Sequence, residues 1–178
     1  NREMRVNIFT ILFFVSFFGF SQIKTPQPSP SSKLEQMVGL TEIEVEYNRP
    51  SKRGRVIFGD LVPFGKLWRT GANSSTKISF STGVEINGNK IKEGTYSIFS
   101  IPNKTNWDII LYSDAELWGV PKDWDDKKIV FKSNYNSLKF NSGNELETFT
   151  ISINNVSNNY FDLFIAWDNT YVKVRIDV

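Results

Sequence analysis

Short runs of alternating apolar and polar residues make up most of the chain beyond residue 40. In the clearest run, from Thr41 to Tyr47, the side chains of Ile43 and Val45 alternate with those of three glutamates. Strict alternation of this kind predicts a strand with one buried and one solvent-facing side. Comparable runs predict further strands at residues 76–80, 84–91, 94–101, 107–112, 148–153, 160–167 and 170–178. In the last two runs, the residues expected to be buried are Phe161, Leu163, Ile165, Trp167, Val172, Val174, Ile176 and Val178.

Turn-forming residues separate these runs. Asn87-Gly88 lies between two apolar segments, which is a strong signal for a tight hairpin turn. Pro50 ends the first run, because proline cannot donate a hydrogen bond to a sheet. Helical periodicity is almost absent, and the only helical candidates are turns around residues 59–67 and 114–118. Regularly spaced short strands predict an all-β fold, a single antiparallel β-sandwich or flattened barrel with little helix.

The N-terminal residues follow a different pattern. A short basic segment, Met4-Arg5, precedes an apolar run at residues 8–20, and Ser21 offers a small residue for cleavage. This layout predicts a secretory signal peptide over residues 1–21. A membrane anchor is the alternative, but the apolar run is shorter than the roughly 20 residues that span hydrocarbon. Residues 22–32, rich in Pro and Ser, predict a tether, which leaves residues 33–178 as a single β-sandwich domain.

Composition narrows the classes of function. After removal of the signal peptide about 157 residues remain, with 19 basic and 18 acidic side chains once Arg2, Glu3 and Arg5 are gone. A net charge near zero gives no reason to expect nucleic acid or an anionic membrane as a partner. The chain has no histidine and no cysteine, which excludes Ser-His-Asp and Cys-His catalysis and the usual zinc and copper sites. We therefore expect an exported, periplasmic or secreted protein without metal or cofactor and without a membrane span after cleavage.

One long segment, Arg49 to Asn73, resembles neither a strand nor a linker. It carries a single acidic residue, Asp60, among aromatic and glycine residues and six basic ones: Arg49, Lys52, Arg53, Arg55, Lys66 and Arg69. An arginine side chain binds carboxylate or phosphate through two parallel hydrogen bonds, and a tryptophan face packs on a sugar or apolar ligand. The candidate ligand-binding residues are therefore Arg69, Asn73, Trp68, Thr70, Arg55 and Arg53.

Two local alternatives follow from this segment. In the first, the basic residues are structural, with Arg49, Arg53 and Arg55 paired to Glu42, Glu44 and Glu46 and with Trp68 plugging one end of the core. In the second, the turn-like residues Thr70 to Asn73 direct Trp68 and Arg69 into one pocket. Arg69 would then be partly buried and need a partner, either Asp60 or a ligand anion.

The segment also carries a longer motif. Its elements are Arg49-Pro50-Ser51, Gly54-Arg55, Leu61-Val62-Pro63 and Trp68 to Asn73, followed downstream by Gly94-Thr95-Tyr96. The chain resembles, from about Ser31 to Val178, the secreted family named domain of unknown function 2911, found mainly in Bacteroidota. The resemblance implies an exported all-β domain and assigns no activity and no residue roles.

Three functions are consistent with these features. The first is an exported binding or accessory domain, monomeric, that recognises a small anionic or glycosidic group through the Arg/Trp/Asn residues above. The second is a histidine-free glycan hydrolase with paired carboxylates, drawn from Asp60, Asp108, Asp114 and Asp123. The third is a purely structural envelope component. Trp118 and Trp124 lie in a turn-rich loop, where they either contact a ligand or fix the loop to the domain, while Trp107 is expected in the core.

Overall fold

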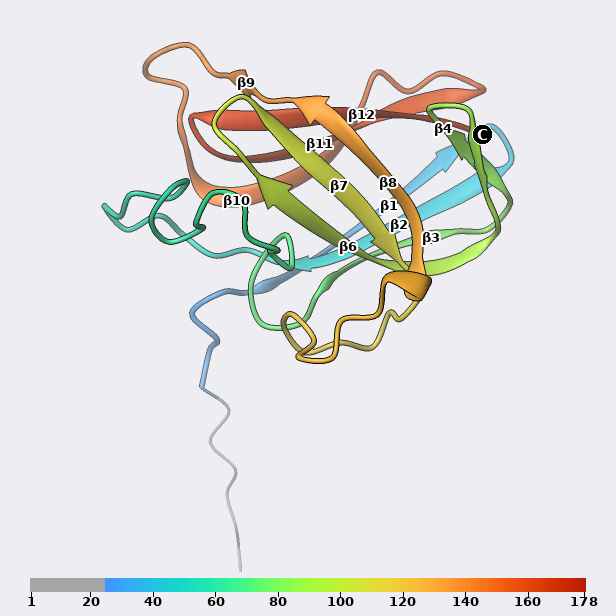
Figure 1. Ribbon diagram of the computed structural model, residues 1–178. Helices are drawn as coiled ribbons and strands as arrows, with labels where there is room; N and C mark the ends of the chain where they lie inside the picture. Colours follow the sequence, from blue (N-terminus) through green and yellow to red (C-terminus); the bar gives the residue numbers. More distant parts are fainter. Residues whose placement is uncertain (1–24) are drawn as a thin grey trace, which may run out of the picture.

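Two antiparallel sheets face each other in the computed structural model, which describes residues 25–178 (Figure 1). The predicted signal peptide, residues 1–21, lies outside the described residues. The first sheet has six strands in the order β1-β2-β3-β6-β7-β8. Their bounds are Ser31–Val38, Thr41–Asn48, Thr76–Phe80, Gly94–Pro102, Asn106–Tyr112 and Ile129–Asn136. The all-β sandwich predicted from the sequence is confirmed.

The second sheet has the order β10-β11-β12-β4-β5, with the short β9 paired to β12. Its strands are β10 (Leu146–Asn154), β11 (Tyr160–Asp168), β12 (Thr170–Asp177), β4 (Val84–Ile86), β5 (Asn89–Ile91) and β9 (Leu138–Lys139). The turn between β4 and β5 is formed by Asn87 and Gly88, both with positive φ, as in the predicted tight hairpin. Chain segments far apart in sequence therefore meet in one sheet.

Helix is confined to a single 3-10 turn, Asp126–Lys128, within the described part of the chain. The two helical candidates, residues 59–67 and 114–118, were wrong, since both segments are irregular. Gly59 and Gly65 have φ values of 98° and 70°, which are incompatible with a continuous right-handed helix. In residues 25–178 there is no helix long and apolar enough to cross a membrane.

The core lies between the sheets and follows the predicted alternation. Ile43 and Val45 of β2 and Ile165 and Val172 of β11 and β12 are fully buried. Of the eight residues predicted to be buried in β11 and β12, seven are buried and Val178 is half-buried against the cluster. β1 begins at Ser31, two residues before the predicted start of the domain.

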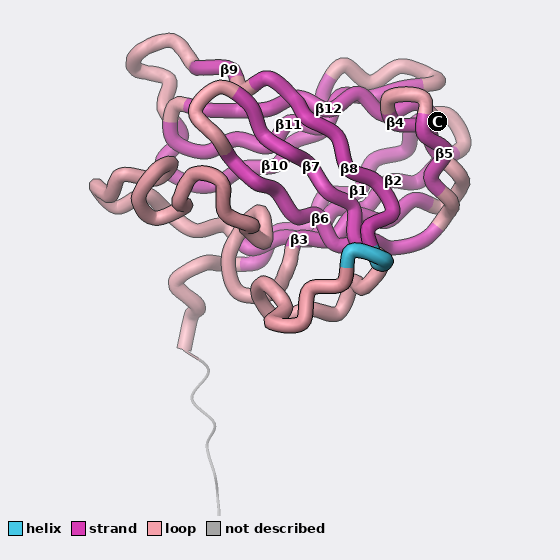
Figure 2. Tube along the Cα trace, in the orientation of Figure 1, coloured by secondary structure: helices cyan, strands magenta, loops and turns pink. Residues whose placement is uncertain are grey.

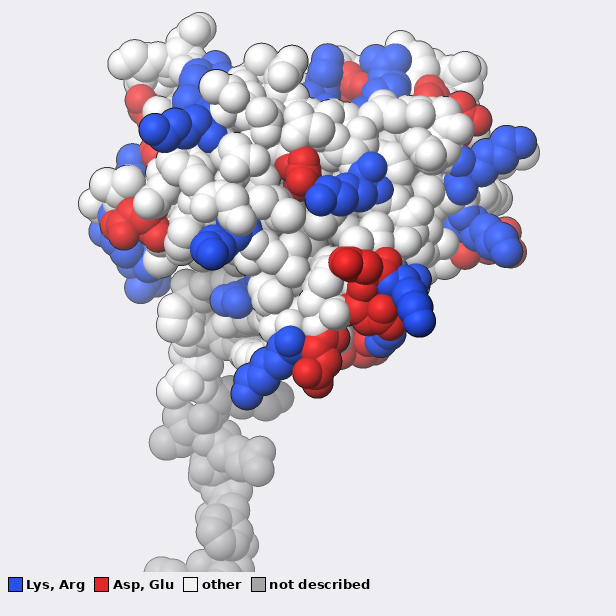
Figure 3. Space-filling model, in the orientation of Figure 1, with Lys and Arg blue, Asp and Glu red and all other residues white. Residues whose placement is uncertain are grey.

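Irregular segments gather at one end of the sandwich, where the described chain also begins (Figure 2). They are the long connection (residues 49–75) between β2 and β3, the β7–β8 loop (residues 113–125) and the N-terminal strap (residues 25–30). On the face in Figure 3, acidic and basic side chains are interspersed and do not form separate patches. This end of the molecule positions the candidate site.

Candidate binding pocket

The long connection crosses from one sheet to the other. At its start, Ser51 forms a bridge with Thr148 of β10, and the Lys52 N–H donates to the Glu147 carbonyl at 2.7 Å. Near its end, Trp68 and Ser100 of β6 exchange backbone hydrogen bonds of 2.8 and 2.9 Å. The connection is thus attached to the second sheet first and to the first sheet afterwards, and it covers the open end of the core.

Apolar side chains in the middle of the connection plug this end. Ile57 and Val62 are buried, and Phe58 packs 4.9 Å from the ring of Trp107. Trp68 completes an aromatic cluster, with ring centroids 5.3 Å from Phe149 and 6.2 Å from Trp167. Trp68 is 9% exposed, so the prediction that it plugs the end of the core describes its packing correctly.

A strained turn follows Trp68. Thr70 and Asn73 adopt positive φ values of 54° and 58°, which are uncommon for residues other than glycine. The carbonyl of Gly71 accepts a 3.0 Å hydrogen bond from Trp68 Nε1, and Thr70 Oγ1 lies 2.9 Å from Ser100 Oγ. These bonds hold an otherwise unfavourable backbone, and such conformations cluster at functional sites.

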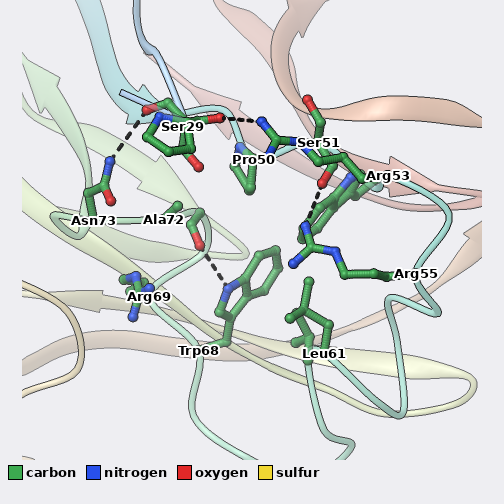
Figure 4. Close-up of a pocket in the computed structure, with 14 residues that line it drawn as sticks. Ser29, Pro50, Ser51, Arg53, Arg55, Leu61, Trp68, Arg69, Ala72 and Asn73 are labelled. Atoms are coloured by element: carbon green, nitrogen blue, oxygen red, sulfur yellow. Dashed lines mark hydrogen bonds between the residues drawn. The ribbon is translucent and has the colours of Figure 1, made fainter. Parts of the chain in front are cut away.

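Beneath this turn lies a pocket with a volume of about 410 Å³ (Figure 4). It is lined by 14 residues, none of them acidic: Pro28, Ser29, Pro50, Ser51, Arg53, Arg55, Leu61, Val62, Trp68, Arg69, Gly71, Ala72, Asn73 and Trp167. Its size falls within the range of pockets that hold small molecules. The structure therefore brings three arginines to one pocket without a lining carboxylate.

Two of these arginines donate to backbone carbonyls. Arg55 Nη2 donates to the Ser51 carbonyl at 2.6 Å, and Arg53 Nη2 donates to the Pro28 carbonyl at 3.3 Å (Figure 4). The predicted pairing of Arg49, Arg53 and Arg55 with Glu42, Glu44 and Glu46 was wrong. The reason is that β1 lies against β2 and supplies Lys33 to Glu44 at 3.0 Å, whereas Arg49 bonds to Phe149 and Thr150 on β10.

Arg69 has no counter-charge among the described residues. Its Nε is fully buried without a hydrogen-bond partner, a state shared within residues 25–178 only by the indole nitrogen of Trp107. No carboxylate lies within 4 Å of its guanidinium, so the predicted pairing with Asp60 was wrong; Asp60 is exposed on the far part of the connection. Burial lowers the pKa of the Arg69 guanidinium. A half-buried cation without a partner is costly, which makes Arg69 the residue most in need of an anion.

Asn73 reaches the N-terminal strap. Its Nδ2 lies 3.0 Å from Gln27 Oε1 and 3.3 Å from the Ser29 carbonyl, and Pro28 and Ser29 themselves line the pocket (Figure 4). The strap falls within the segment predicted to be a tether. Here its last residues form one wall of the pocket.

Five of the six candidate residues line this pocket, and one does not. Thr70 is fully buried, and its hydroxyl lies 2.9 Å from that of Ser100 on β6. Sequence reasoning missed Pro28, Ser29 and Trp167 as lining residues. Their contributions come from distant parts of the chain, and no local pattern marks them.

The remaining tryptophans divide between core and surface. Trp107 is fully buried, as predicted. Trp124 stacks on Tyr112 at 4.3 Å and fixes the β7–β8 loop to the domain. Trp118 in the same loop is 76% exposed. Trp124 thus fixes the loop to the domain, and ligand contact by Trp118 stays a prediction.

Acidic side chains line other parts of the surface. Glu44, Glu46 and Glu116 line a smaller hollow of about 240 Å³ on the first sheet, where Lys33 and Lys77 form ion pairs with Glu44 and Glu116. Asp108 and Asp114 pair with Lys132 and Lys128. Across residues 25–178, no group of three or more acidic side chains is arranged to hold a metal ion.

Comparison with known proteins places the whole domain in one family. The profile of the family described as Protein of unknown function (DUF2911) matches residues 29–176. The chain belongs to the DUF2911 family. The match includes the end of the strap, the long connection and all twelve strands except Asp177, the last residue of β12. No curated protein and no solved structure matches this DUF2911 chain. The match establishes the family of the chain but assigns no role to the pocket.

Proposed function

We propose that this DUF2911 protein is an exported binding protein, periplasmic or secreted, whose pocket recognises a small anionic ligand. Arg69 contacts the anion, Arg53 and Arg55 add positive charge at the rim, and Asn73 donates from its amide. The observation that carries the proposal is the half-buried guanidinium of Arg69, whose buried Nε has no hydrogen-bond partner within the described residues. Export rests on the signal peptide expected at residues 1–21.

The charge balance of the pocket supports an anion over a neutral or cationic ligand. Three guanidinium groups line it and none of the lining residues is acidic. Because the site is partly shielded from water, each charge acts more strongly there than at an open surface. Arginine also offers a planar pair of donors that matches a carboxylate or a phosphate.

The same feature favours binding over hydrolysis. A glycosidase of the usual kind needs two carboxylates on either side of the scissile bond, roughly 5–10 Å apart. This pocket is lined by none. Glu44, Glu46 and Glu116 line a smaller hollow of about 240 Å³ elsewhere, and two of these three carboxylates form ion pairs with lysines.

Replacement of Arg69 by methionine tests the proposal. Arg69→Met keeps most of the side-chain volume and removes the charge, and it leaves no protein carboxylate without its partner. The free energy of unfolding should therefore stay within about 1 kcal/mol of wild type. A ligand at 100 times its dissociation constant stabilises the wild-type protein by about 2.7 kcal/mol, and this gain should disappear in the variant.

The measurement is a thermal-shift screen of phosphate, sulfate, acetate, citrate and glucuronate. Lys66→Met is the matched control, since Lys66 is an exposed cation of the same connection and does not line the pocket. It should respond to anions as the wild type does. Equal anion responses in the wild type and Arg69→Met would refute the proposal, as would a large loss of stability in Arg69→Met alone.

A further inference from the structure

Trp118 is displayed to solvent by a loop that is otherwise well fixed. The indole side chain is 76% exposed, whereas Leu117 and Trp124 on either side pack against the small cluster of Phe99, Ile110 and Tyr112. Tryptophan is rarely left this open, because its large apolar face is better buried. The exposure is therefore a property of this position and not of a loosely held loop.

The loop is fixed next to the pocket. Trp118 forms a backbone bridge with Ser74, and the Ser75 N–H donates to the Leu117 carbonyl at 2.9 Å. Ser74 directly follows Asn73, a lining residue of the pocket. The β7–β8 loop thus runs alongside the strained turn.

The loop also reaches Arg69. Gly119 has a φ of 81°, and a Cβ atom at this position would lie 3.7 Å from Arg69 Nη1. The Arg69 guanidinium therefore lies beside Gly119, the residue that follows the exposed Trp118. Because Trp118 and Gly119 are adjacent in the chain, a ligand that extends from Arg69 past Gly119 would reach Trp118.

The aromatic rings that line the pocket already pack against other aromatic rings of the core. Trp68 stacks on Trp167 with an interplanar angle of 18° and meets Phe58, Trp107 and Phe149 edge to face. Among the other lining residues, Ser29, Ser51 and Asn73 are polar, and Pro28, Pro50, Leu61, Val62 and Ala72 are apolar. The pocket thus offers a cation, hydroxyl and amide groups, and Trp118 adds an open aromatic face in the loop beside it.

We propose that the ligand is an acidic sugar, a hexuronic acid or a short oligosaccharide that contains one. Its carboxylate pairs with Arg69, its hydroxyl groups bond to the polar lining, and one apolar face of the ring packs on Trp118. The inference rests on the proposed anion-binding function. A nucleoside phosphate also joins an anion to a flat group, and adenosine monophosphate is therefore the competing ligand in the test.

Isothermal titration calorimetry of the purified protein distinguishes these ligands. The probes are glucuronate, a dimeric uronate, glucose, acetate and adenosine monophosphate. The uronates should bind and glucose should not. Trp118→Ala should weaken uronate binding about three- to tenfold, because aromatic packing of this kind contributes about 0.5–1.5 kcal/mol. Acetate, which has no ring, should bind Trp118→Ala and wild type equally.

Two variants complete the test. Trp118→Phe keeps an aromatic face and should retain most of the uronate affinity, and Val156→Ala, at another exposed apolar residue, should retain all of it. Trp118→Ala should unfold at the wild-type temperature, since its indole is open to solvent. Uronate binding that is insensitive to Trp118→Ala overturns the inference.

These measurements distinguish a wrong acidic-sugar inference from a wrong proposed function. If adenosine monophosphate or acetate binds in an Arg69-dependent way and uronates do not, the acidic-sugar inference is wrong and anion binding stands. If no anion binds and Arg69→Met changes nothing, both are wrong.

Discussion

Asp162 shows how this protein handles a buried charge, and it contrasts with Arg69. Its carboxylate is fully buried on β11, where Arg175 Nε donates at 2.6 Å and Asn155 Nδ2 at 2.7 Å. Arg175 in turn lies over the ring of Tyr160 at 3.9 Å. Burial raises the pKa of Asp162, but the hydrogen bonds from Arg175 and Asn155 outweigh it and hold the pKa below its usual range. Asp162 is paired inside the fold, whereas Arg69 is not.

Asp162→Asn should destabilise the protein at neutral pH. The new amide would present a donor to Asn155 and weaken the bond from Arg175, a loss of about 1–3 kcal/mol. Because the pKa of Asp162 is lowered by folding, its contribution is present above the unfolded value of about 3.9 and lost as pH falls through the folded value. Urea unfolding should show the difference between wild type and variant at pH 7 and its decline below about pH 4.

The control for this comparison is Asp177→Asn. Asp177 is an exposed carboxylate two residues from Arg175 on β12. It should change stability by less than about 0.5 kcal/mol. A difference for Asp162→Asn that persists undiminished at low pH would contradict the charge-based explanation.

At the scale of elements, the N-terminal strap accepts hydrogen bonds from donors that we propose for the ligand. Gln27 and Ser29 occupy the amide of Asn73, and Pro28 occupies one donor of Arg53. Deletion of residues 25–29 should free these donors and strengthen the binding of acetate several-fold, because an average hydrogen bond contributes about 1 kcal/mol and acetate has no hydroxyl groups that could bond to Ser29. Calorimetry with acetate measures the effect.

The fold should survive this deletion. The strap precedes β1, and the pairing of β1 with β2 begins at Ser31. Substitution of residues 25–29 by a Gly-Ser segment of equal length is the matched control for chain length. Unchanged or weaker binding after the deletion would show that the strap supports the ligand and does not compete with it.

The elements that sequence alone could predict are those with one strongly apolar face. β2, β3 and the β4–β5 hairpin were recognised from alternation and from Asn87-Gly88, because a buried face selects apolar residues at every second position. β1 and β8 were not recognised. They are the two edges of the first sheet, and most of their side chains are exposed or half-buried.

Of the candidate pocket, too, only the part with a local sequence pattern could be predicted. Arg53, Arg55, Arg69 and Asn73 stood out as polar residues among glycines within one segment. Arg69's lack of a partner could not be predicted, since it depends on where Asp60 lies in space. The role of Gly119 beside Arg69 depends equally on a loop that is about 50 residues away in sequence.

At the scale of the whole molecule, the two sheets and the long connection share one core. Phe149 of β10 is fully buried and contacts Tyr47 of the first sheet and Trp68 of the connection. Tyr47 Oη also donates to the Ile151 carbonyl across the sandwich at 3.2 Å. The pocket is therefore built on the core and not on a separate unit.

Phe149→Ala should reduce the stability of the entire domain. Removal of a fully buried phenylalanine costs about 3–5 kcal/mol. Far-UV and near-UV circular dichroism should follow one coincident urea transition in both wild type and variant, as a shared core requires. Phe140→Ala, at a half-buried ring outside this cluster, should cost clearly less. Separate transitions for the two signals would mean that the connection unfolds independently.

The distribution of the tryptophans has an optical consequence. Trp68, Trp107 and Trp167 are buried and within reach of one another, whereas Trp118 is open to water. Their emission should consist of a blue-shifted, shielded component and a red-shifted component that acrylamide quenches. Of the shielded rings, Trp68 and Trp167 line the pocket, and the quenched ring is the one on which we place the sugar. The native protein thus carries separate intrinsic fluorophores for the two parts of its candidate site, without any added label.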